Sequence, residues 1–186
     1  MVASEGLYWR VPFEWAGDRE ARREPEPLHV GWQAATDFPD LTRLVGSVLA
    51  NSVDASDLAA VEALGPTGAA ERILSPPEGF SYRPEWWQVL RYGESAAGFV
   101  LPVTFDGCER DGLDEATIYH MGIAPAHRGQ RLARLLLRKA TVTLTDHGVW
   151  RIYCDTAAAN AAMIHLFESE GWKRLPAEQR PIVPPA

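Results

Sequence analysis

The residues with the clearest chemical meaning lie between positions 120 and 137, where the pattern predicts a buried strand, a tight turn with Pro125, and a helix. The first turn of that helix carries Arg128, Gly129, Gln130 and Arg131. Backbone N–H groups are free at a helix N-terminus and bind phosphate, and a glycine lets the ligand approach the backbone closely. The turn therefore predicts a phosphate or pyrophosphate site. A plain strand-to-helix connection with a basic surface is the alternative.

Two motifs in this part of the chain resemble those of a known family. Residues 128 to 133 (Arg-Gly-Gln-Arg-Leu-Ala) resemble the acetyl-CoA signature of the GNAT superfamily of N-acetyltransferases, which reads Arg or Gln, two residues, Gly, one residue, then Gly or Ala. Residues 123 to 125 match the end of the family's preceding strand. Residues 160 to 172 resemble the second signature, and the resemblance as a whole covers roughly residues 28 to 175.

The chain departs from the family pattern at two positions. Arg131 stands where the family usually has a glycine, and binding should survive there if the backbone stays helical, because the amides donate whatever the side chain. Phe167 stands where many members carry a tyrosine that protonates the departing thiolate. A thiol has a pKa of about 8.5 and leaves tolerably well unprotonated, so Phe167 does not exclude catalysis. A core aromatic on the last helix explains Phe167 as well.

The resemblance implies an α/β fold whose mixed, mostly antiparallel sheet splays open at a cofactor cleft and is flanked by helices. It implies acetyl-CoA as co-substrate and acetyl transfer to a primary amine by direct attack in a ternary complex, with the diphosphate on the amides of residues 129 to 133. The residues that it places at the coenzyme are Met121, Gly122, Ile123, Arg128, Gly129, Gln130, Arg131, Leu132, Ala133, Asn160 and Phe167. Two alternatives stay open: an acyl-CoA-binding sensor or interaction module without turnover, and a structural domain that binds no CoA.

Attack by an amine requires a group that accepts a proton, because a lysine-like amine with a pKa of about 10.4 is almost entirely protonated at neutral pH. The strand before the signature offers His120, Tyr119 and Glu115 as catalytic candidates. His120 suits the role because an imidazole titrates near neutrality. A satisfied strand histidine, a packed tyrosine and a solvated glutamate are the structural alternatives. Asp155, at the end of the next predicted strand, is a further residue that can face the cleft.

Acidic residues gather in two other places, a predicted hairpin loop and the early helices. If they line the acceptor cleft, the expected acceptor is a cationic amine, although acidic loops are also simply solvated. The residues are Glu109, Asp111, Asp114 and Glu115 in the loop, and Asp54, Asp57 and Glu62 in the helices.

The 186 residues have the composition of one globular domain, with 46% hydrophobic residues and a formal net charge of −7. The acidic balance argues against nucleic-acid and anionic-membrane partners. Two cysteines, an N-terminus unlike a signal peptide and the lack of a long apolar run predict a reduced, cytoplasmic protein. The histidines lack metal-ligand spacing, so no metal is predicted. We expect a small-molecule or peptide amine as the partner, and a monomer or homodimer.

The order of the predicted elements divides the chain into an N-terminal extension or arm, residues 1–27, and one domain, residues 28–186. Helices between the later strands require a crossover, so the sheet is predicted to be mixed. Pro102 predicts a bulge or an edge position within its strand. Asp40 is a suitable N-cap, and Gly148 sits where a helix ends. The expected strands are 28–33, 86–91, 97–105, 116–123, 150–155 and 172–174, and the expected helices are 41–49, 56–64, 67–74, 128–146 and 160–170.

Overall fold

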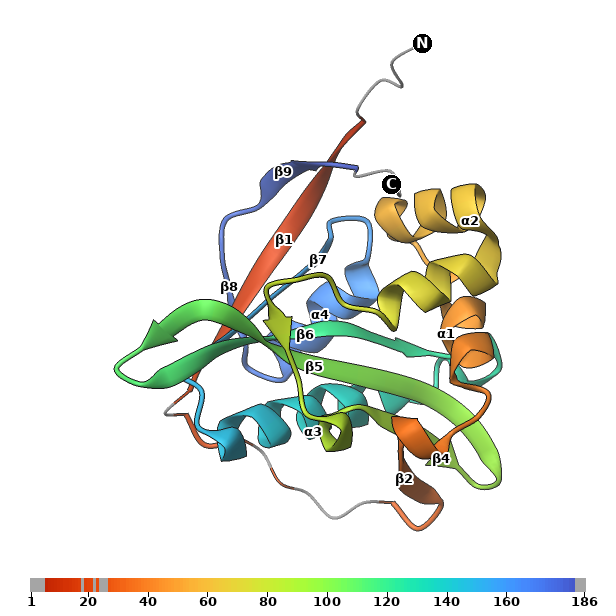
Figure 1. The fold of residues 1–186 in the computed structure, drawn as a ribbon, viewed down its shortest axis with the longest axis horizontal. Coiled ribbons are helices and arrows are strands. Elements are labelled where there is room, and N and C mark those ends of the chain that lie inside the picture. Colours follow the sequence, from red (N-terminus) through yellow and green to blue (C-terminus); the bar gives the residue numbers. More distant parts are fainter. Residues whose placement is uncertain (1–5, 18, 22, 24–26, 183–186) are drawn as a thin grey trace.

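The protein was analysed as a computed structural model, which describes residues 6–17, 19–21, 23 and 27–182 (Figure 1). The strands of its sheet are β1 (Leu7–Ala16), β2 (Val30–Ala34), β3 (Phe80–Ser81), β4 (Gln88–Tyr92), β5 (Ser95–Arg110), β6 (Leu113–Ile123), β7 (Arg151–Ala157), β8 (Lys173–Arg174) and β9 (Glu178–Pro181). The α-helices are α1 (Leu41–Leu49), α2 (Ala55–Ile73), α3 (Leu132–His147) and α4 (Ala161–Ser169). Short 3₁₀ turns cover Ala35–Asp37, Pro84–Trp86 and Pro125–His127.

The sheet is mixed and mostly antiparallel, which confirms the fold class expected from the sequence. Its main order is β2-β4-β5-β6-β7-β1-β8, with β3 beside β5 and β9 beside β1. Only β6 and β7 run parallel, because α3 crosses from the end of one to the start of the other. None of the helices in the described part of the chain has both the length and the apolar character that crossing a membrane requires.

The two parallel strands are paired at only two register positions, Glu115 with Arg151 and Ala116 with Ile152. Beyond these two positions the backbone pairing of β6 with β7 stops, and the Ile118 amide donates instead to the Cys154 Sγ at 3.3 Å. Burial raises the pKa of the Cys154 thiol to about 12, so it stays protonated. From this point the strands separate, which is the splayed cleft that the resemblance implies.

The N-terminal segment has a different place from the expected extension. Residues 10 to 16 of β1 pair with the whole of β7, while β8 and β9 pair with the other edge of β1. Val11 and Phe13 are buried in the main core. A strand with such an apolar face must bury it against the rest of the sheet, so β1 is an internal strand rather than an arm. Residues 1–5, 18, 22 and 24–26 of the expected extension lie outside the described residues.

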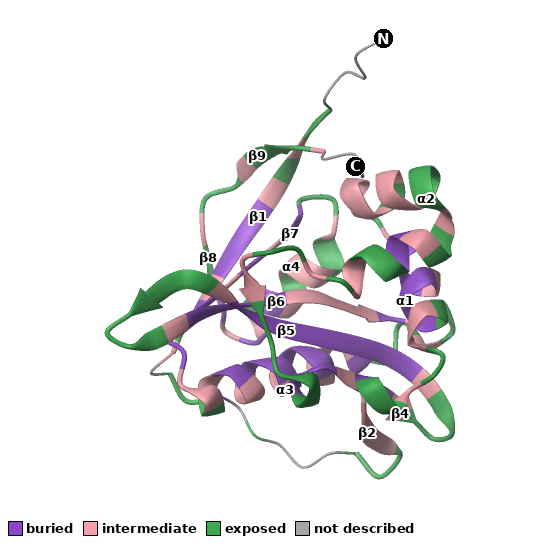
Figure 2. Cartoon of the chain, in the orientation of Figure 1, coloured by how far each residue is buried: buried purple, intermediate pink, exposed green. Residues whose placement is uncertain are grey.

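Two glycines show that α1 and α3 cover opposite faces of the sheet. A Cβ added at Gly98 of β5 would meet Leu136 of α3, while one added at Gly122 of β6 would meet Val48 of α1. Gly98 pairs with Ile123, the neighbour of Gly122, and successive side chains of a strand point to opposite faces. Between these layers β5 is buried over residues 97–104, and it is exposed at Ser95 and over residues 106–110 toward the β5–β6 hairpin (Figure 2).

The predicted irregularity at Pro102 is confirmed and bears on the site. Leu101 pairs with His120 and Pro102 pairs with Ile118, which leaves Tyr119 as an extra residue on β6. Proline has no N–H to donate to the ladder, and a bulge re-aims the side chains next to it. As a result Tyr119 and His120, although adjacent in a strand, both line one cavity.

Several boundaries differ from the expected ones. The third main helix begins at Leu132 rather than at residue 128, because Pro125–His127 forms a 3₁₀ turn and Arg131 is left-handed. Asp40 occupies the N-cap of α1, but its side chain pairs with Arg43 instead of capping. The hairpin ladder continues to Arg110, so Asp111 and Gly112 alone make the turn. The two expected helices between residues 56 and 74 form one element with a break at Gly65.

Candidate active site

A cavity of about 850 Å³ opens where β6 and β7 separate. Its walls come from these strands, from β1, and from the loop between α1 and α2. The turn before α3 and the inner face of α4 close the remaining sides. Figure 1 shows how these elements converge from opposite ends of the chain. A cavity of this size accommodates a small organic ligand.

The turn between β6 and α3 presents a row of backbone donors to one end of the cavity. Among the described residues, no backbone acceptor takes the amides of residues 129 to 133. Gly129 has φ of 78°, and a Cβ built on it would meet nothing within 4 Å, so this face of the turn is open. Free amides that converge before a helix form an anion-binding concavity. The turn therefore has the free backbone donors that the predicted phosphate site requires, and the site stays a prediction.

The backbone at Arg131 is not helical, contrary to the condition that we set for binding there. Arg131 has φ of 62° and ψ of 13°, which is the left-handed region where a glycine is usual. The residue sits at the N-cap of α3 with its side chain exposed at the rim of the cavity. The amides stay open in this conformation, so the turn keeps its donors at the cost of a strained arginine.

The basic residues of this turn have unequal roles. The Arg128 guanidinium donates to the backbone oxygens of Ile123 and Asn51, at 3.2 and 2.9 Å, and so ties the turn to the end of α1. Arg134 pairs with the buried Glu170 at 2.9 Å. Gln130 is exposed and does not line the cavity. Arg131 therefore contributes an exposed charge at the cavity, while Arg128 mainly shapes the turn.

The other residues expected at the coenzyme surround the same cavity. Met121, Gly122, Ile123, Leu132 and Ala133 line it from β6 and the start of α3. Asn160 lines it and caps α4, since its side-chain oxygen accepts from the Met163 amide at 3.2 Å. Phe167 also lines it, and its ring stacks on Phe13 with centroids 4.7 Å apart. Asn160 and Phe167 thus combine the structural role with a place at the cavity.

The three catalytic candidates on β6 are separated by the structure. His120 and Tyr119 line the cavity, whereas Glu115 lies outside it. The Glu115 carboxylate accepts from the Arg151 Nε at 2.9 Å, at the position where β6 and β7 still pair. Glu115 is buried in this ion pair, and we assign it a structural role instead of a catalytic one.

His120 and Asp57 form a partly buried pair at the other end of the cavity. The Nε2 of His120 lies 3.3 Å from the Asp57 Oδ1, with side-chain exposures of 16% and 17%. Burial acts to raise the pKa of Asp57, but the bond and charge of His120, the Ser52 hydroxyl and the charge of Arg10 together hold it below its ordinary value. The Asp57 carboxylate is therefore ionised at neutral pH and acts only as an acceptor.

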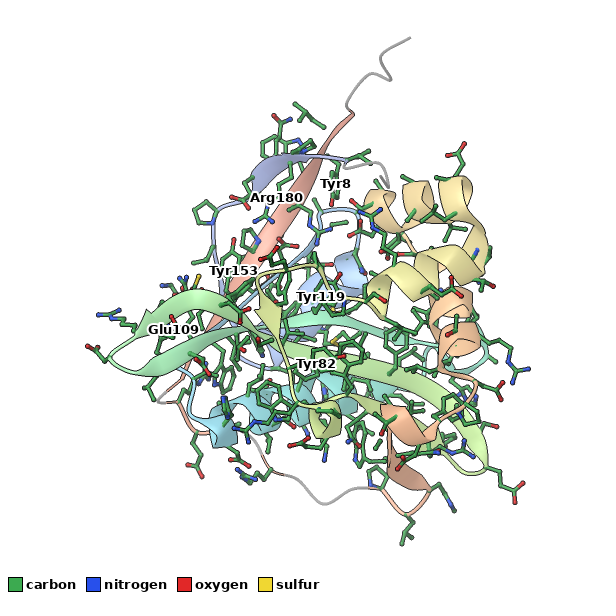
Figure 3. All side chains as sticks on the ribbon, in the orientation of Figure 1. Tyr8, Tyr82, Glu109, Tyr119, Tyr153 and Arg180 are labelled. Atoms are coloured by element: carbon green, nitrogen blue, oxygen red, sulfur yellow. The ribbon has the colours of Figure 1, made fainter. Side chains whose placement is uncertain are left out.

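The surroundings of Tyr119 favour its protonated form. Burial raises the pKa of the Tyr119 phenol, opposed by the charge of Arg72. The phenol is therefore protonated at neutral pH and is suited to donating a hydrogen bond or a proton, not to accepting one. Its ring packs on Phe80, with centroids 5.3 Å apart (Figure 3).

A second polar cluster in the cavity centres on Arg10 of β1. Arg10 pairs with Asp54 at the start of α2 and donates from Nε to Asp155 of β7 at 2.8 Å. Tyr8, on the same face of β1, bonds through its hydroxyl to Ser56 at 2.7 Å (Figure 3). These contacts fix the first turn of α2 against β1 and β7. They also place the carboxylates of Asp54 and Asp155 at this end of the cavity.

The sequence reasoning placed Asp54, Asp57 and Asp155 correctly as possible cleft residues but missed Arg10 and Tyr8. Glu62 and the hairpin acids do not line the cavity, and Glu109 lies out on the projecting hairpin (Figure 3). The missed signal was the aromatic and apolar run of residues 7 to 15, which is too long and too apolar to lie apart from the sheet.

Comparison with known proteins agrees with the fold. The model of the Acetyltransferase (GNAT) family matches residues 66–172. The [ribosomal protein bS18]-alanine N-acetyltransferase of Escherichia coli strain K12 is 30% identical over 103 residues, which cover 55% of this chain and 63% of that protein. The protein of the same name from Salmonella typhimurium is 37% identical over 60 residues, 32% of this chain and 40% of that protein. The chain thus aligns with less than two thirds of either relative.

Solved structures resemble the whole chain in fold. A GCN5-related N-acetyltransferase from Sphaerobacter thermophilus has a TM-score of 0.58 at 16% identity, covering 96% of this chain and 53% of that one. A tandem GNAT protein from the clavulanic acid biosynthesis pathway has a TM-score of 0.55 at 14% identity, covering 97% of this chain and 55% of that one. At these identities the likeness concerns the fold.

Proposed function

The chain belongs to the GNAT family of acetyltransferases, and we propose that it transfers an acetyl group from acetyl-CoA to a primary amine. The observation that carries this proposal is the chemical division of the cavity. Its ionisable residues on the β6–α3 turn are all basic, whereas the start of α2 and β7 contribute Asp54, Asp57 and Asp155, three carboxylates beside the single arginine Arg10 of β1. One end thus suits a phosphorylated coenzyme and the other suits a cationic amine.

The residues of the cleft fit a CoA-like ligand. The amides of residues 129 to 133 would hold the diphosphate, and the unpaired edge of β6 from Met121 to Ile123 would bind the amides of the pantetheine arm. Leu132, Ala133, Asn160 and Phe167 would line that arm. When bound, acetyl-CoA supplies an acetyl thioester that is activated for attack by an amine.

His120 is our candidate for the group that accepts the proton of the acceptor amine. Its imidazole lines the cavity, and its Nδ1 is buried without a hydrogen-bond partner among the described residues. The neighbouring carboxylates attract an ammonium, but only the neutral amine attacks, so a base at this end is needed. Tyr119, whose phenol stays protonated, is our candidate proton donor in place of the tyrosine absent at Phe167.

The acceptor is a primary amine whose identity we leave to experiment. The curated relatives are named for an alanine of ribosomal protein bS18, so a peptide α-amine belongs in the first test. A suitable panel holds a peptide with a free N-terminal alanine, a lysine peptide with a blocked N-terminus, and a polyamine. An α-amine has a pKa near 8 and is neutral far more often at pH 7 than a lysine, so the alanine peptide is the expected best acceptor.

Binding and turnover are tested separately. Acetyl-CoA at 100 times its Kd should stabilise the protein by about 2.7 kcal/mol, seen as a raised melting temperature. Gly129→Glu, which puts a carboxylate among the free amides, should abolish that shift. Gly107→Glu is the matched control, because Gly107 has φ of 77° and equally open surroundings but lies in the hairpin.

Each outcome has a distinct meaning. A thermal shift in the control that is lost in Gly129→Glu, together with acetylated product, supports the proposal. A shift without product from any amine supports the acyl-CoA sensor in its place, the alternative that Arg131 and Phe167 raise. Equal shifts in both variants would show that the coenzyme does not use this turn.

A further inference from the structure

One nitrogen of the His120 imidazole makes no hydrogen bond to the described residues. The Nδ1 of His120 is buried, and no hydrogen-bond partner for it exists among the described residues. A buried polar atom without a partner destabilises the folded state. Such an atom is kept where a ligand or a reacting group supplies the missing partner.

Contacts to Nε2 and to the face of the ring hold the His120 imidazole in place. Nε2 faces the Asp57 Oδ1 at 3.3 Å, and the Ser52 hydroxyl donates to the other Asp57 oxygen at 2.6 Å. Phe99 stacks on the imidazole, with the ring centroids 5.8 Å apart. The ring plane and the carboxylate are thus both fixed before any substrate arrives.

The angle between the Phe99 and His120 ring planes is 22°. The two rings are therefore close to parallel. A stacked neighbour of this kind limits rotation of the imidazole about its χ2 angle, so Nδ1 keeps one direction.

These contacts decide which nitrogen of a neutral His120 carries the proton. An ionised carboxylate only accepts hydrogen bonds, so the nitrogen that faces Asp57 must be the donor. The proton then resides on Nε2, and the lone pair is left on Nδ1, the atom without a partner. We propose that Asp57 is a positioning residue that fixes His120 in the Nε2–H tautomer, with Nδ1 as the atom that takes the proton of the acceptor amine.

The proposal rests on the proposed function for its reaction step, which balances as follows. The amine nitrogen forms a bond to the acetyl carbon, and the carbon–sulfur bond breaks with its electron pair leaving on the thiolate. One nitrogen proton passes to Nδ1 of His120. The imidazolium, bonded through Nε2 to Asp57, then releases that proton to solvent or to the thiolate.

Two measurements test the proposal, one of the His120 tautomer and one of the rate of turnover. Nitrogen-15 NMR of the full chain reads the protonation of each imidazole nitrogen, with the His120 signals assigned from a His120→Gln sample. The expected wild-type result is the Nε2–H form. Asp57→Ala should give a mixture of the two tautomers, and Asp57→Asn, which keeps the shape, guards against a folding defect. Asp54→Asn is the matched control, a carboxylate three residues away that pairs with Arg10 rather than with His120, and it should leave the tautomer unchanged.

Steady-state kinetics supplies the second readout. The kcat of Asp57→Ala and Asp57→Asn should fall about 10- to 100-fold, part of the 10²- to 10⁴-fold that a positioned base contributes, while the KM for acetyl-CoA stays within about twofold. A wild-type Nδ1–H tautomer, or an identical tautomer in wild type and Asp57→Ala, would overturn the proposal. An unchanged kcat would overturn its role in the reaction. If the wild type acetylates no amine, the proposed function fails, and the NMR result still decides the positioning role.

Discussion

Arg131 offers the sharpest test of how the coenzyme turn works, because one residue carries both strain and charge. Its φ of 62° lies in the left-handed region, and its side chain is exposed at the cavity rim. Arg131→Gly removes the strain and the charge together. Arg131→Ala removes the charge and keeps the strain, so the pair separates the two effects.

The expected magnitudes differ for stability and for binding. A left-handed conformation costs an L-residue about 1–2 kcal/mol, and a glycine costs about 0.5–1 kcal/mol through the entropy of the unfolded chain. Arg131→Gly should therefore be more stable than Arg131→Ala by roughly 0.5–1 kcal/mol, or about 1–4 °C in Tm for a chain of this size. An exposed ion pair contributes about 0.2–1 kcal/mol, so both variants should bind acetyl-CoA at most about fivefold more weakly.

Urea unfolding and calorimetric titration at two salt concentrations measure these quantities. The affinity difference from the wild type should shrink at high salt, because exposed charges are screened. Equal stability of the glycine and alanine variants would refute the assignment of strain to Arg131. Wild-type affinity in both variants would show that the amides bind the diphosphate without help from this side chain.

Three further predictions follow from buried or crowded groups. In the native protein one of the two cysteines, the exposed Cys108, should react rapidly with a thiol reagent at pH 8, because burial and a pKa of about 12 protect Cys154; two rapid thiols would contradict this. Gly122→Ala should destabilise the protein by about 1–3 kcal/mol in urea, since its Cβ would lie 2.3 Å from the Val48 Cγ1, whereas Gly31→Ala, whose nearest contact is 3.9 Å away, should not. The lowered pKa of Asp57 stabilises the folded state above its ordinary value of 3.8, and this contribution is lost as the pH falls through the folded pKa. The stability advantage over Asp57→Asn should therefore shrink below about pH 4, and an advantage independent of pH would argue against the pairing.

Local residue signals predicted much of the fold and part of the site. Apolar periodicity located α1, α3 and α4, Pro102 marked the bulge, and the gap expected between the helices 56–64 and 67–74 lies at the break of α2 at Gly65. These signals act within a few residues, so they are readable in sequence. The phosphate-binding turn was predicted for the same reason, since its amides and Gly129 are neighbours along the chain.

What the sequence did not predict depends on contacts between distant segments. The place of β1 is set by pairing with β7, more than a hundred residues away in the chain. The His120–Asp57 pair joins residues 63 positions apart. The left-handed Arg131 follows from how the turn closes onto α3, because nothing in an arginine itself favours that conformation.

The match to the family model does not cover the two halves of the cavity equally. The match to the family covers residues 66–172, which include the β6 edge, the amide turn and α4. Arg10, Asp54 and Asp57 all lie before it. Arg10 binds Asp155 on β7 and Asp54 at the start of α2, so β1 holds the loop that carries the partner of His120 in place. Because β1 pairs with one edge of β7 along its length, that strand is rigid while its other edge stays open to the cleft. Acceptor choice should therefore depend on residues before position 66, and exchanging that region between relatives should change the preferred amine while leaving acetyl-CoA binding intact.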